Sequence, residues 1–356
     1  MRKKILIVNR EQYGFHIDTY KYCEYLNGSF NITYLGWEQR KSEKIPSEGV
    51  IVKYISREGN MLSRYLRFLK EVNTEVRRNT YDLIFLVYFP GSSIIKLLNR
   101  TKKFNIDIRS CATGLNKLTN RIQDLLLRVE CMFFKNVSII SNSLAEAIKL
   151  ERYHLLPLGG ERFSNNKKSF ESLKLLYVGS LFGRNIMECV KGFHKFLKYN
   201  SDRVELSFTI IGDSPGAEKD EICHYIIQNN LEKFIKVEGY IHNTLLHRYF
   251  EEANIGIAYI PRITYFDNQP PTKTFEYLVS GLPVIATTTK EHIKIISEDC
   301  GILIDDNKEA FAAGIHEIFI RRNSFDSELI KYLYKDHLWK NIVERNLKPY
   351  LIALIQ

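Results

Sequence analysis

The feature that most constrains the fold is an alternation of short apolar runs with longer helical stretches along the 356 residues of the chain. The short runs are rich in Val, Ile and Leu, and the stretches between them have the apolar spacing of helices. This alternation is typical of βαβ units, in which successive strands lie parallel in one sheet. We therefore predict an α/β fold. In the first half the expected strands are 5–8, 32–35, 50–54, 83–87, 104–108, 137–140 and 154–156, and the expected helices are 16–26, 61–77 and 120–134.

The alternation starts again after residues 165–169, a polar stretch without apolar side chains that predicts a linker. Two open α/β domains joined in this way place a cleft between the carboxyl ends of their strands. We expect the first domain to span residues 1–168 and the second 169–336, and a final helical stretch to pack on an earlier surface. In the second half the expected strands are 173–178, 206–211, 234–237, 255–259, 284–286 and 301–304, and the expected helices are 186–199, 218–229, 272–280 and 338–354.

The composition excludes several other classes of protein. With 45% apolar and 26% charged residues the chain is not disordered, and its apolar runs are shorter than the roughly 18 residues of a membrane-spanning helix. Only residues 5–8 are apolar after the basic start, which is too short for a signal peptide, so we expect a cytoplasmic protein. The six cysteines lie far apart without a C-x-x-C pair, which predicts reduced thiols and no zinc site.

The net charge of +10 is unevenly distributed. Residues 1–168 contain 29 Lys and Arg against 16 Asp and Glu, whereas residues 169–356 contain 22 against 25. A basic half attracts a polyanion or an anionic membrane surface, although a merely solubilising surface has the same composition. The densest basic group with interleaved apolar residues is Arg64, Arg67 and Lys70. No nucleic-acid partner is expected, because the basic half has no recognised motif and no ladder of Arg and aromatic residues.

A proline pair and the residues after it form the most informative stretch. Pro270 and Pro271 interrupt the preceding chain and predict a helix start at Thr272, where free backbone amides and the helix dipole favour an anion. Lys273 in the first turn is unfavourable in a purely structural helix but suits a bound phosphate. One turn later, Glu276 can accept hydrogen bonds from two adjacent ribose hydroxyls.

The run from Pro271 to Ala286, P-x-K-x-x-E-Y-L-x-x-G-x-P-V-I-A, resembles the donor-site motif of GT-B-fold glycosyltransferases, especially the retaining family four, glycosyl transferases group 1. In that family two glutamates are separated by seven residues; the first contacts the transferred sugar and the second the ribose. Glu276 occupies the second position. Asn268 occupies the first, where it can bond sugar hydroxyls without carrying a charge.

Further segments resemble the same family in order and spacing. Residues 176–184 resemble the strand and glycine loop that open the C-terminal domain, with Ser180 where the family has an Arg. Glycines in such a loop let backbone amides approach an anion, and Arg184 is a bidentate donor. Residues 208–216 and 237–240 resemble segments that line the donor pocket. The resemblance thus implies a nucleotide-sugar site formed by Gly179, Arg184, Gly212, Asp213, Gly239, Tyr240, Lys273, Thr274 and Glu276.

The N-terminal half resembles the family less closely. Gly14 and Phe15 follow the first strand, where the family has an acceptor loop that contains glycine. His16 and Arg109 are, with Asn268, the expected catalytic residues, because the family places comparable side chains near the donor sugar. A single histidine after a strand is also typical of a helix start, and this alternative remains open for His16.

The resemblance implies a GT-B fold: two Rossmann-like domains that face each other across a cleft, with a C-terminal helix, residues 337–356, that crosses back onto the first domain. The implied activity is retaining transfer of a sugar from a UDP- or GDP-linked donor to a saccharide or lipid-linked saccharide, in the synthesis of cell-surface polysaccharide. The acceptor suggests a location at the inner face of the cell membrane.

No D-x-D sequence is present to hold a divalent ion on the diphosphate. We therefore expect no metal and no cofactor besides the nucleotide sugar, with Arg184, Lys273 and the helix start supplying the positive charge. Two alternatives stay open. One is a nucleotide-sugar 2-epimerase of the same fold, and the other is a catalytically inactive protein that binds a sugar nucleotide or polysaccharide.

Overall fold

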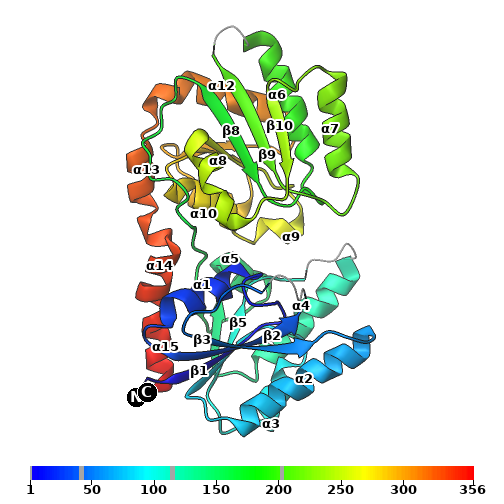
Figure 1. The fold of residues 1–356 in the computed structure, drawn as a ribbon, viewed down its shortest axis with the longest axis vertical. Coiled ribbons are helices and arrows are strands. Elements are labelled where there is room, and N and C mark those ends of the chain that lie inside the picture. The colour runs from blue at the N-terminus through cyan, green and yellow to red at the C-terminus, as the bar shows by residue number, and fades with distance from the viewer. Residues whose placement is uncertain (1, 40–43, 113–116, 201–203) are drawn as a thin grey trace. The chain divides into compact units, whose positions relative to one another are not determined.

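The computed structural model describes residues 2–39, 44–112, 117–200 and 204–356 (Figure 1). The chain divides into two compact units. Unit 1 comprises Met1–Pro157 and Trp339–Gln356, and unit 2 comprises Leu158–Leu338.

The described part of unit 1 contains a seven-stranded sheet in the order β3-β2-β1-β4-β5-β6-β7. All its strand pairs are parallel. The central strands are buried along almost their whole length because helices cover both faces, which explains why they appear in the sequence as continuous apolar runs. The strands are β1 Lys4–Val8, β2 Asn31–Glu38, β3 Val50–Ser56, β4 Leu83–Val87, β5 Phe104–Ile108, β6 Asn136–Ile139 and β7 His154–Leu155, and the helices are α1 Ile17–Leu26, α2 Met61–Arg78, α3 Ser92–Leu98, α4 Lys117–Cys131 and α5 Asn142–Ala147.

The C-terminal helical segment belongs to unit 1, where it packs on α1 (Figure 1). It consists of α14 Trp339–Ile342, a π-helical turn Val343–Leu347 and α15 Lys348–Ile355. Pro349 is the second residue after this π-helical turn. Proline lacks an N–H and its ring collides with the carbonyl four residues earlier in a regular α-helix, and the wider turn relieves that collision. The buried Trp339 ring lies edge-on to Tyr22, with 6.1 Å between the ring centroids.

Unit 2 contains, among its described residues, a six-stranded parallel sheet in the order β10-β9-β8-β11-β12-β13. Its strand side chains alternate between two apolar clusters, since Tyr177 and Ile210 enter one and Leu176 and Ile211 the other. The strands are β8 Leu173–Val178, β9 Leu206–Ile211, β10 Ile235–Gly239, β11 Ile255–Ala258, β12 Val284–Thr287 and β13 Gly301–Ile304, and the helices are α6 Ile186–Asn200, α7 Glu218–Gln228, α8 His247–Glu252, α9 Thr264–Asp267, α10 Thr272–Val279, α11 Lys290–Ile295, α12 Lys308–Arg321 and α13 Ser327–Leu333.

The predicted strands at 83–87, 104–108, 173–178, 206–211 and 301–304 have the observed bounds. The helices α3, α5, α9, α11, α12 and α13 were not expected from the sequence. Most of these helices are one or two turns long, which is too short for a helical period to stand out, and they depend on packing against the sheets.

The polar stretch 165–169, expected to link two domains, lies within unit 2, and the units divide at 157/158 instead of 168/169. The reason is that its polar groups bond to unit 2. Lys168 Nζ donates to the carbonyls of Phe250 and Glu251, the latter at 3.0 Å, and the Lys168 amide donates to Ser327 Oγ at 3.0 Å.

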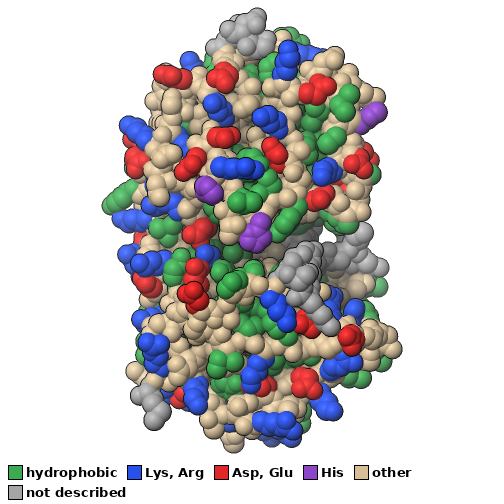
Figure 2. Space-filling view, viewed as in Figure 1, with side chains coloured by type: hydrophobic (Ala, Val, Ile, Leu, Met, Phe, Trp, Pro, Cys, Tyr) green, Lys and Arg blue, Asp and Glu red, His purple; other side chains and the backbone are tan. Residues whose placement is uncertain are grey.

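The charge asymmetry of the sequence follows the two units. Unit 1 contains 29 Lys and Arg against 16 Asp and Glu, and unit 2 contains 22 against 25. Lys and Arg side chains are numerous on the face of unit 1 seen in Figure 2. Among the helices that the structure describes, none has the length and apolar character that crossing a bilayer requires.

Gly256 allows α10 to lie directly on β11. A Cβ at this position would be 2.3 Å from Tyr277 Cγ, so we expect Gly256→Ala to destabilise unit 2 by about 1–3 kcal/mol through overpacking. The measurement is the thermal unfolding midpoint, which should fall by a few degrees. Gly28→Ala is the control, because a Cβ there meets nothing within 4 Å. Equal midpoints for the two variants would contradict the close approach.

Candidate active site

In unit 2 the strand order reverses between β8 and β11, which are neighbours although β9 and β10 come between them in the chain. At such a reversal the loops after the carboxyl ends of the strands diverge and leave space for a ligand. Gly179 follows β8 and Gly212 follows β9. The Gly179 amide donates to the Ile211 carbonyl at 2.9 Å, and the Gly212 amide donates to the Gly239 carbonyl at 2.8 Å.

The two loops approach so closely that only glycine fits at position 212. A Cβ on Gly212 would lie 1.9 Å from the carbonyl oxygen of Gly179. Both glycines are expected at the donor site from the sequence, and in the structure their loops are in contact. Gly239 ends β10 in the left-handed region, with φ +71°. These three glycines thus position the loops at the carboxyl edge of the sheet.

The N-terminus of α10 lies at the same edge. Pro271 is its extended N-cap residue, and no side chain in the described structure caps this end. Gly160 packs against the first turns of the helix, since a Cβ there would be 2.7 Å from the amide nitrogen of Glu276. No local sequence signal predicts this role for Gly160, because the approach joins residues more than a hundred positions apart.

Lys273, in the first turn of α10, is half-buried. Its Nζ lies 4.0 Å from the centroid of the Tyr177 ring, and a Cβ on Gly179 would be 3.4 Å from it. Burial and the nearby Arg184 guanidinium lower the pKa of Lys273 well below its ordinary value. Among the described residues no acceptor forms a hydrogen bond or ion pair with this ammonium. The site therefore favours an anion, which would stabilise the protonated lysine.

Arg184 supplies a second positive charge near Lys273. Its guanidinium carbon lies 3.9 Å from the centroid of the Phe266 ring on α9, in stacking distance. The Arg184 amide donates to the Leu181 carbonyl at 3.1 Å and so fixes the turn after β8. The structure thus brings together two cations and an uncapped helix start, as the sequence analysis expected.

Thr274 and Glu276 have different surroundings although both lie on α10. The Thr274 side chain is fully buried, and its Oγ1 lies 3.0 Å from His292 Nε2. His292 Nδ1 in turn lies 2.7 Å from the Thr287 carbonyl oxygen, so Thr274 anchors α10 to the β12–α11 connection. Thr274, expected among the donor-binding residues, directs its side chain into the protein. Glu276 is half-buried one turn after Lys273.

His292 was missed by the sequence analysis, since no motif surrounds it. Burial lowers its pKa to about 4, so the ring is neutral at ordinary pH.

The other residues expected at the donor site lie at the ends of neighbouring elements. Asp213 is exposed, accepts from the Ser214 amide at 2.9 Å and lies 3.9 Å from Lys219 Nζ. Tyr240 follows β10 with its ring exposed, and Asn268 ends α9.

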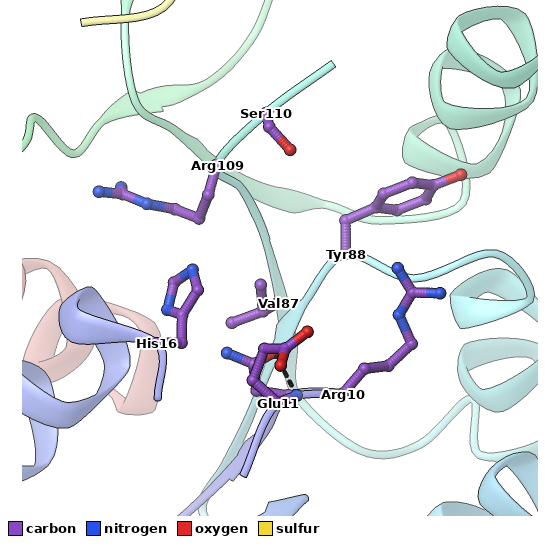
Figure 3. A pocket seen from close by; sticks show the side chains of 8 residues that line it. Arg10, Glu11, His16, Val87, Tyr88, Arg109 and Ser110 are labelled. Atoms are coloured by element: carbon purple, nitrogen blue, oxygen red, sulfur yellow. Dashed lines mark hydrogen bonds between the residues drawn. The ribbon is translucent and has the colours of Figure 1, made fainter. Parts of the chain in front are cut away.

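Unit 1 contains a pocket of about 170 Å³ at its own reversal of strand order, between β1 and β4 (Figure 3). His16 and Arg109 lie on one side of it, and Arg10 and Tyr88 on the other (Figure 3). The remaining lining residues are Asn9, Glu11, Val87 and Ser110. Gly14 and Phe15, expected on the acceptor side, are not among the lining residues; Gly14 instead packs against Ile45.

Arg109 is held by a buried network beneath the pocket. Its Nε donates to Asp18 Oδ2 at 2.6 Å, and its Nη1 donates to the Leu156 carbonyl at 2.8 Å. Asp107 Oδ2 lies 3.8 Å from Arg109 Nε. Burial raises the pKa of Asp107 to about 6, although the positive charge of Arg109 opposes this rise. Arg109 is thus a fixed, charge-balanced group at the pocket wall.

His16 is the N-cap of α1, and its Nδ1 accepts from the Thr19 amide at 3.4 Å. The alternative of a helix-start histidine is therefore confirmed, and the same ring also lines the pocket. Burial lowers the pKa of His16. Within the described ranges, no group of three or more His, Cys, Asp or Glu side chains could hold a metal ion.

Residues 172–320 match the family model of glycosyl transferases group 1. The match extends from the start of β8 into α12, and it confirms the resemblance indicated by the motif at Pro271–Ala286. No curated protein matches the sequence.

Solved structures resemble the chain over nearly its whole length. Sucrose-phosphate synthase from Thermosynechococcus elongatus is 16% identical, with a TM-score of 0.76 over 99% of this chain and 100% of that one. Anabaena HepE in complex with UDP and glucose is 12% identical, with a TM-score of 0.76 and the same coverage. A glycosyltransferase from Rickettsia africae ESF-5 is 15% identical, with a TM-score of 0.74 over 99% of both chains. At these identities the likeness shows the fold alone, and it confirms the predicted GT-B fold.

The buried His292 makes the stability of unit 2 dependent on pH. Its pKa is about 4 when folded and near 6.5 when unfolded, so the unfolded state binds an additional proton between these values. The free energy of unfolding should therefore fall as the pH decreases from about 6.5 to 4, by on the order of 3 kcal/mol from this group.

The measurement is the thermal midpoint between about pH 7 and 4 for the wild type and for His292→Gln, whose amide does not titrate there. The variant should lose less stability on acidification than the wild type. His247→Gln, at an exposed position, is the control. Parallel curves for the wild type and His292→Gln would show that this ring does not contribute.

Proposed function

We propose that the protein is a retaining, metal-independent glycosyltransferase. It moves a sugar from a nucleoside diphosphate to a saccharide or lipid-linked saccharide in the synthesis of cell-surface polysaccharide. The observation that carries the proposal is the pair Lys273 and Arg184 beside the uncapped start of α10, inside the segment that matches the glycosyl transferases group 1 model.

The donor diphosphate fits the electrostatics of this site. Two cations held close together at the carboxyl edge of a sheet repel each other, which contributes to the lowered pKa of Lys273. A diphosphate removes this repulsion and also accepts bonds from the free amides of the helix start. The same groups stabilise the charge that develops on the leaving phosphate, which is the role that a metal ion has in other enzymes.

The nucleotide and sugar ends of the donor are assigned to neighbouring residues. Glu276 accepts hydrogen bonds from the ribose hydroxyls, and Tyr240 lies beside the base. Asn268 contacts the transferred sugar. The solved structures of Anabaena HepE include complexes with UDP and with UDP-glucose, so we infer a uridine nucleotide as the first donor to test.

The pocket of unit 1 is assigned to the acceptor. Asn9, Glu11 and His16 offer hydrogen-bonding groups to sugar hydroxyls, and the buried Arg109 holds the wall of the pocket in place. In the reaction the bond between the anomeric carbon and the phosphate oxygen breaks. The acceptor oxygen then bonds to that carbon on the same face, and its proton passes to the departing phosphate. No side chain of the protein is required as the base.

Glu276→Ala should weaken UDP binding at least tenfold and abolish sugar transfer, because two ribose hydroxyls lose their acceptor. Titration calorimetry with UDP gives the affinity, and release of UDP in the presence of acceptor gives the rate. Glu298→Ala, at an exposed position, is the matched control. Unchanged UDP affinity in Glu276→Ala would remove this residue from the site. Conversion of a nucleotide sugar incubated without acceptor would indicate an epimerase instead.

Lys273→Met and Arg184→Met should each lower kcat/KM, with a loss of about 2–4 kcal/mol of transition-state stabilisation. EDTA should leave the wild-type rate unchanged. Both variants should weaken binding of UDP but not of uridine, because the lost contacts are to phosphate. In the wild type, UDP binding should take up a proton at pH values above the lowered pKa of Lys273.

Calorimetry in two buffers of different ionisation enthalpy measures this uptake, which Lys273→Met should abolish. A strict requirement for magnesium or manganese would contradict the metal-independent mechanism. An equal loss of UDP and uridine affinity would place the two cations away from the diphosphate.

A further inference from the structure

Helix α4 of unit 1 exposes a continuous row of aliphatic side chains. Leu118 is 66% exposed, Ile122 60%, Leu125 59% and Val129 43%. Their spacing of four, three and four residues places them on one side of the helix. We call these four residues the α4 stripe. Isolated exposed aliphatic residues are common, but a row along three turns is typical of a surface that contacts another apolar phase.

The two acidic side chains of α4, Asp124 and Glu130, face the protein, whereas carboxylates on an ordinary surface helix point to solvent. Glu130 is buried, and its carboxylate accepts from the amides of Gly91 at 2.7 Å and Ser93 at 3.0 Å. Asp124 accepts from the Ala112 amide at 2.9 Å. Together with the buried Leu127, these bonds fix the rotation of the helix about its axis. The outward direction of the α4 stripe is therefore built into the fold.

The neighbouring helix α3 extends the apolar surface. Glu130 caps the start of α3 and so holds it against α4, and α3 itself exposes Ile94 and Leu98, each 50% accessible. Both helices lie in unit 1 (Figure 1).

The charges around the stripe have one sign. Arg121 and Arg128 are exposed and seven residues apart, so they lie along the same edge of the stripe. Both carboxylates of α4 are engaged by backbone amides, and residues 92–103 contain Lys and Arg but no Asp or Glu. An apolar row bordered by arginines complements the anionic headgroups and acyl chains of a bilayer. A second copy of the chain packed across a two-fold axis would instead bring arginines against arginines.

We propose that the α4 stripe docks unit 1 on an anionic lipid bilayer, with α4 lying in the headgroup region and its aliphatic side chains among the acyl chains. This surface differs from the one predicted on α2. On α2 Phe68 packs in the core, whereas Leu62 and Leu66 are 68% and 56% exposed. Arg67 Nη1 donates to the carbonyls of Ser56 at 3.1 Å and Glu58 at 3.0 Å. The docking proposal is independent of the proposed sugar transfer, because it uses no residue of the nucleotide site or of the pocket.

The test is co-sedimentation of the full chain with phosphatidylcholine vesicles and with vesicles in which about a third of the lipid is phosphatidylglycerol. The wild type should bind the anionic vesicles, and more weakly at about 1 M than at about 0.15 M salt, because the Debye length falls from about 8 to 3 Å. The double variant Ile122→Ser/Leu125→Ser should bind at least tenfold more weakly. Arg121→Gln/Arg128→Gln should lose about fivefold per charge on the anionic vesicles.

Ile320→Ser is the matched control, since Ile320 is 63% exposed on α12 in unit 2 and lies outside the stripe. It should bind vesicles as the wild type does. All variants should retain the wild-type thermal midpoint and UDP affinity, which separates loss of docking from loss of fold or of the donor site.

Equal vesicle binding by the stripe variant and Ile320→Ser would overturn the proposal, as would the absence of wild-type binding to anionic vesicles. A concentration-dependent dimer in analytical ultracentrifugation that the stripe variant abolishes would also overturn it, because the stripe would then be an interface between copies of the chain.

Discussion

The approach of the Gly212 backbone to the carbonyl of Gly179 is the constraint on which the carboxyl edge of the unit 2 sheet depends. A side chain at position 212 would overlap that carbonyl, so the loops after β8 and β9 meet only because glycine occupies this position. The contact leaves the Gly179 turn beside Lys273 Nζ, and Arg184 follows in the same loop. The proposed nucleotide site therefore depends on backbone packing, which places the cations and the start of α10 at one edge of the sheet.

In unit 1 the pocket depends on buried charges and not on a close approach of two backbone segments. Arg109 is held between Asp18 and the Leu156 carbonyl, with Asp107 close by. A buried arginine held by hydrogen bonds from Nε and Nη1 keeps a fixed position, so it shapes the pocket more than it acts as a mobile catalytic group. His16 has a similar double role, since capping α1 fixes the ring that lines the pocket.

Helix α4 shows how hydrogen bonds decide which face of an amphipathic helix points outward. Its residues have an ordinary helical period, and from the pattern alone the aliphatic row would be assigned to the core. Glu130 accepts hydrogen bonds from the amides at the start of α3, and Asp124 accepts one from the Ala112 amide, so these two carboxylates are held inward while Arg121 and Arg128 stay exposed. The surface that results is apolar and basic, which is the combination that a membrane-associated protein requires.

The sequence by itself determined the α/β class, the parallel strands of both sheets and the motif from Pro271 to Ala286, because these depend on short-range periodicity, on proline and glycine chemistry and on residue order. The tertiary structure alone decided features that join distant residues: the packing of Gly160 on α10, the Thr274–His292 contact that turns Thr274 inward, and the burial of Arg109 against Asp18. It also decided where the units divide, since the polar stretch 165–169 bonds to unit 2. The physical reason is the same throughout: a local pattern specifies which side of an element is apolar, whereas its burial and the partners of its polar groups depend on the chain segments packed against it.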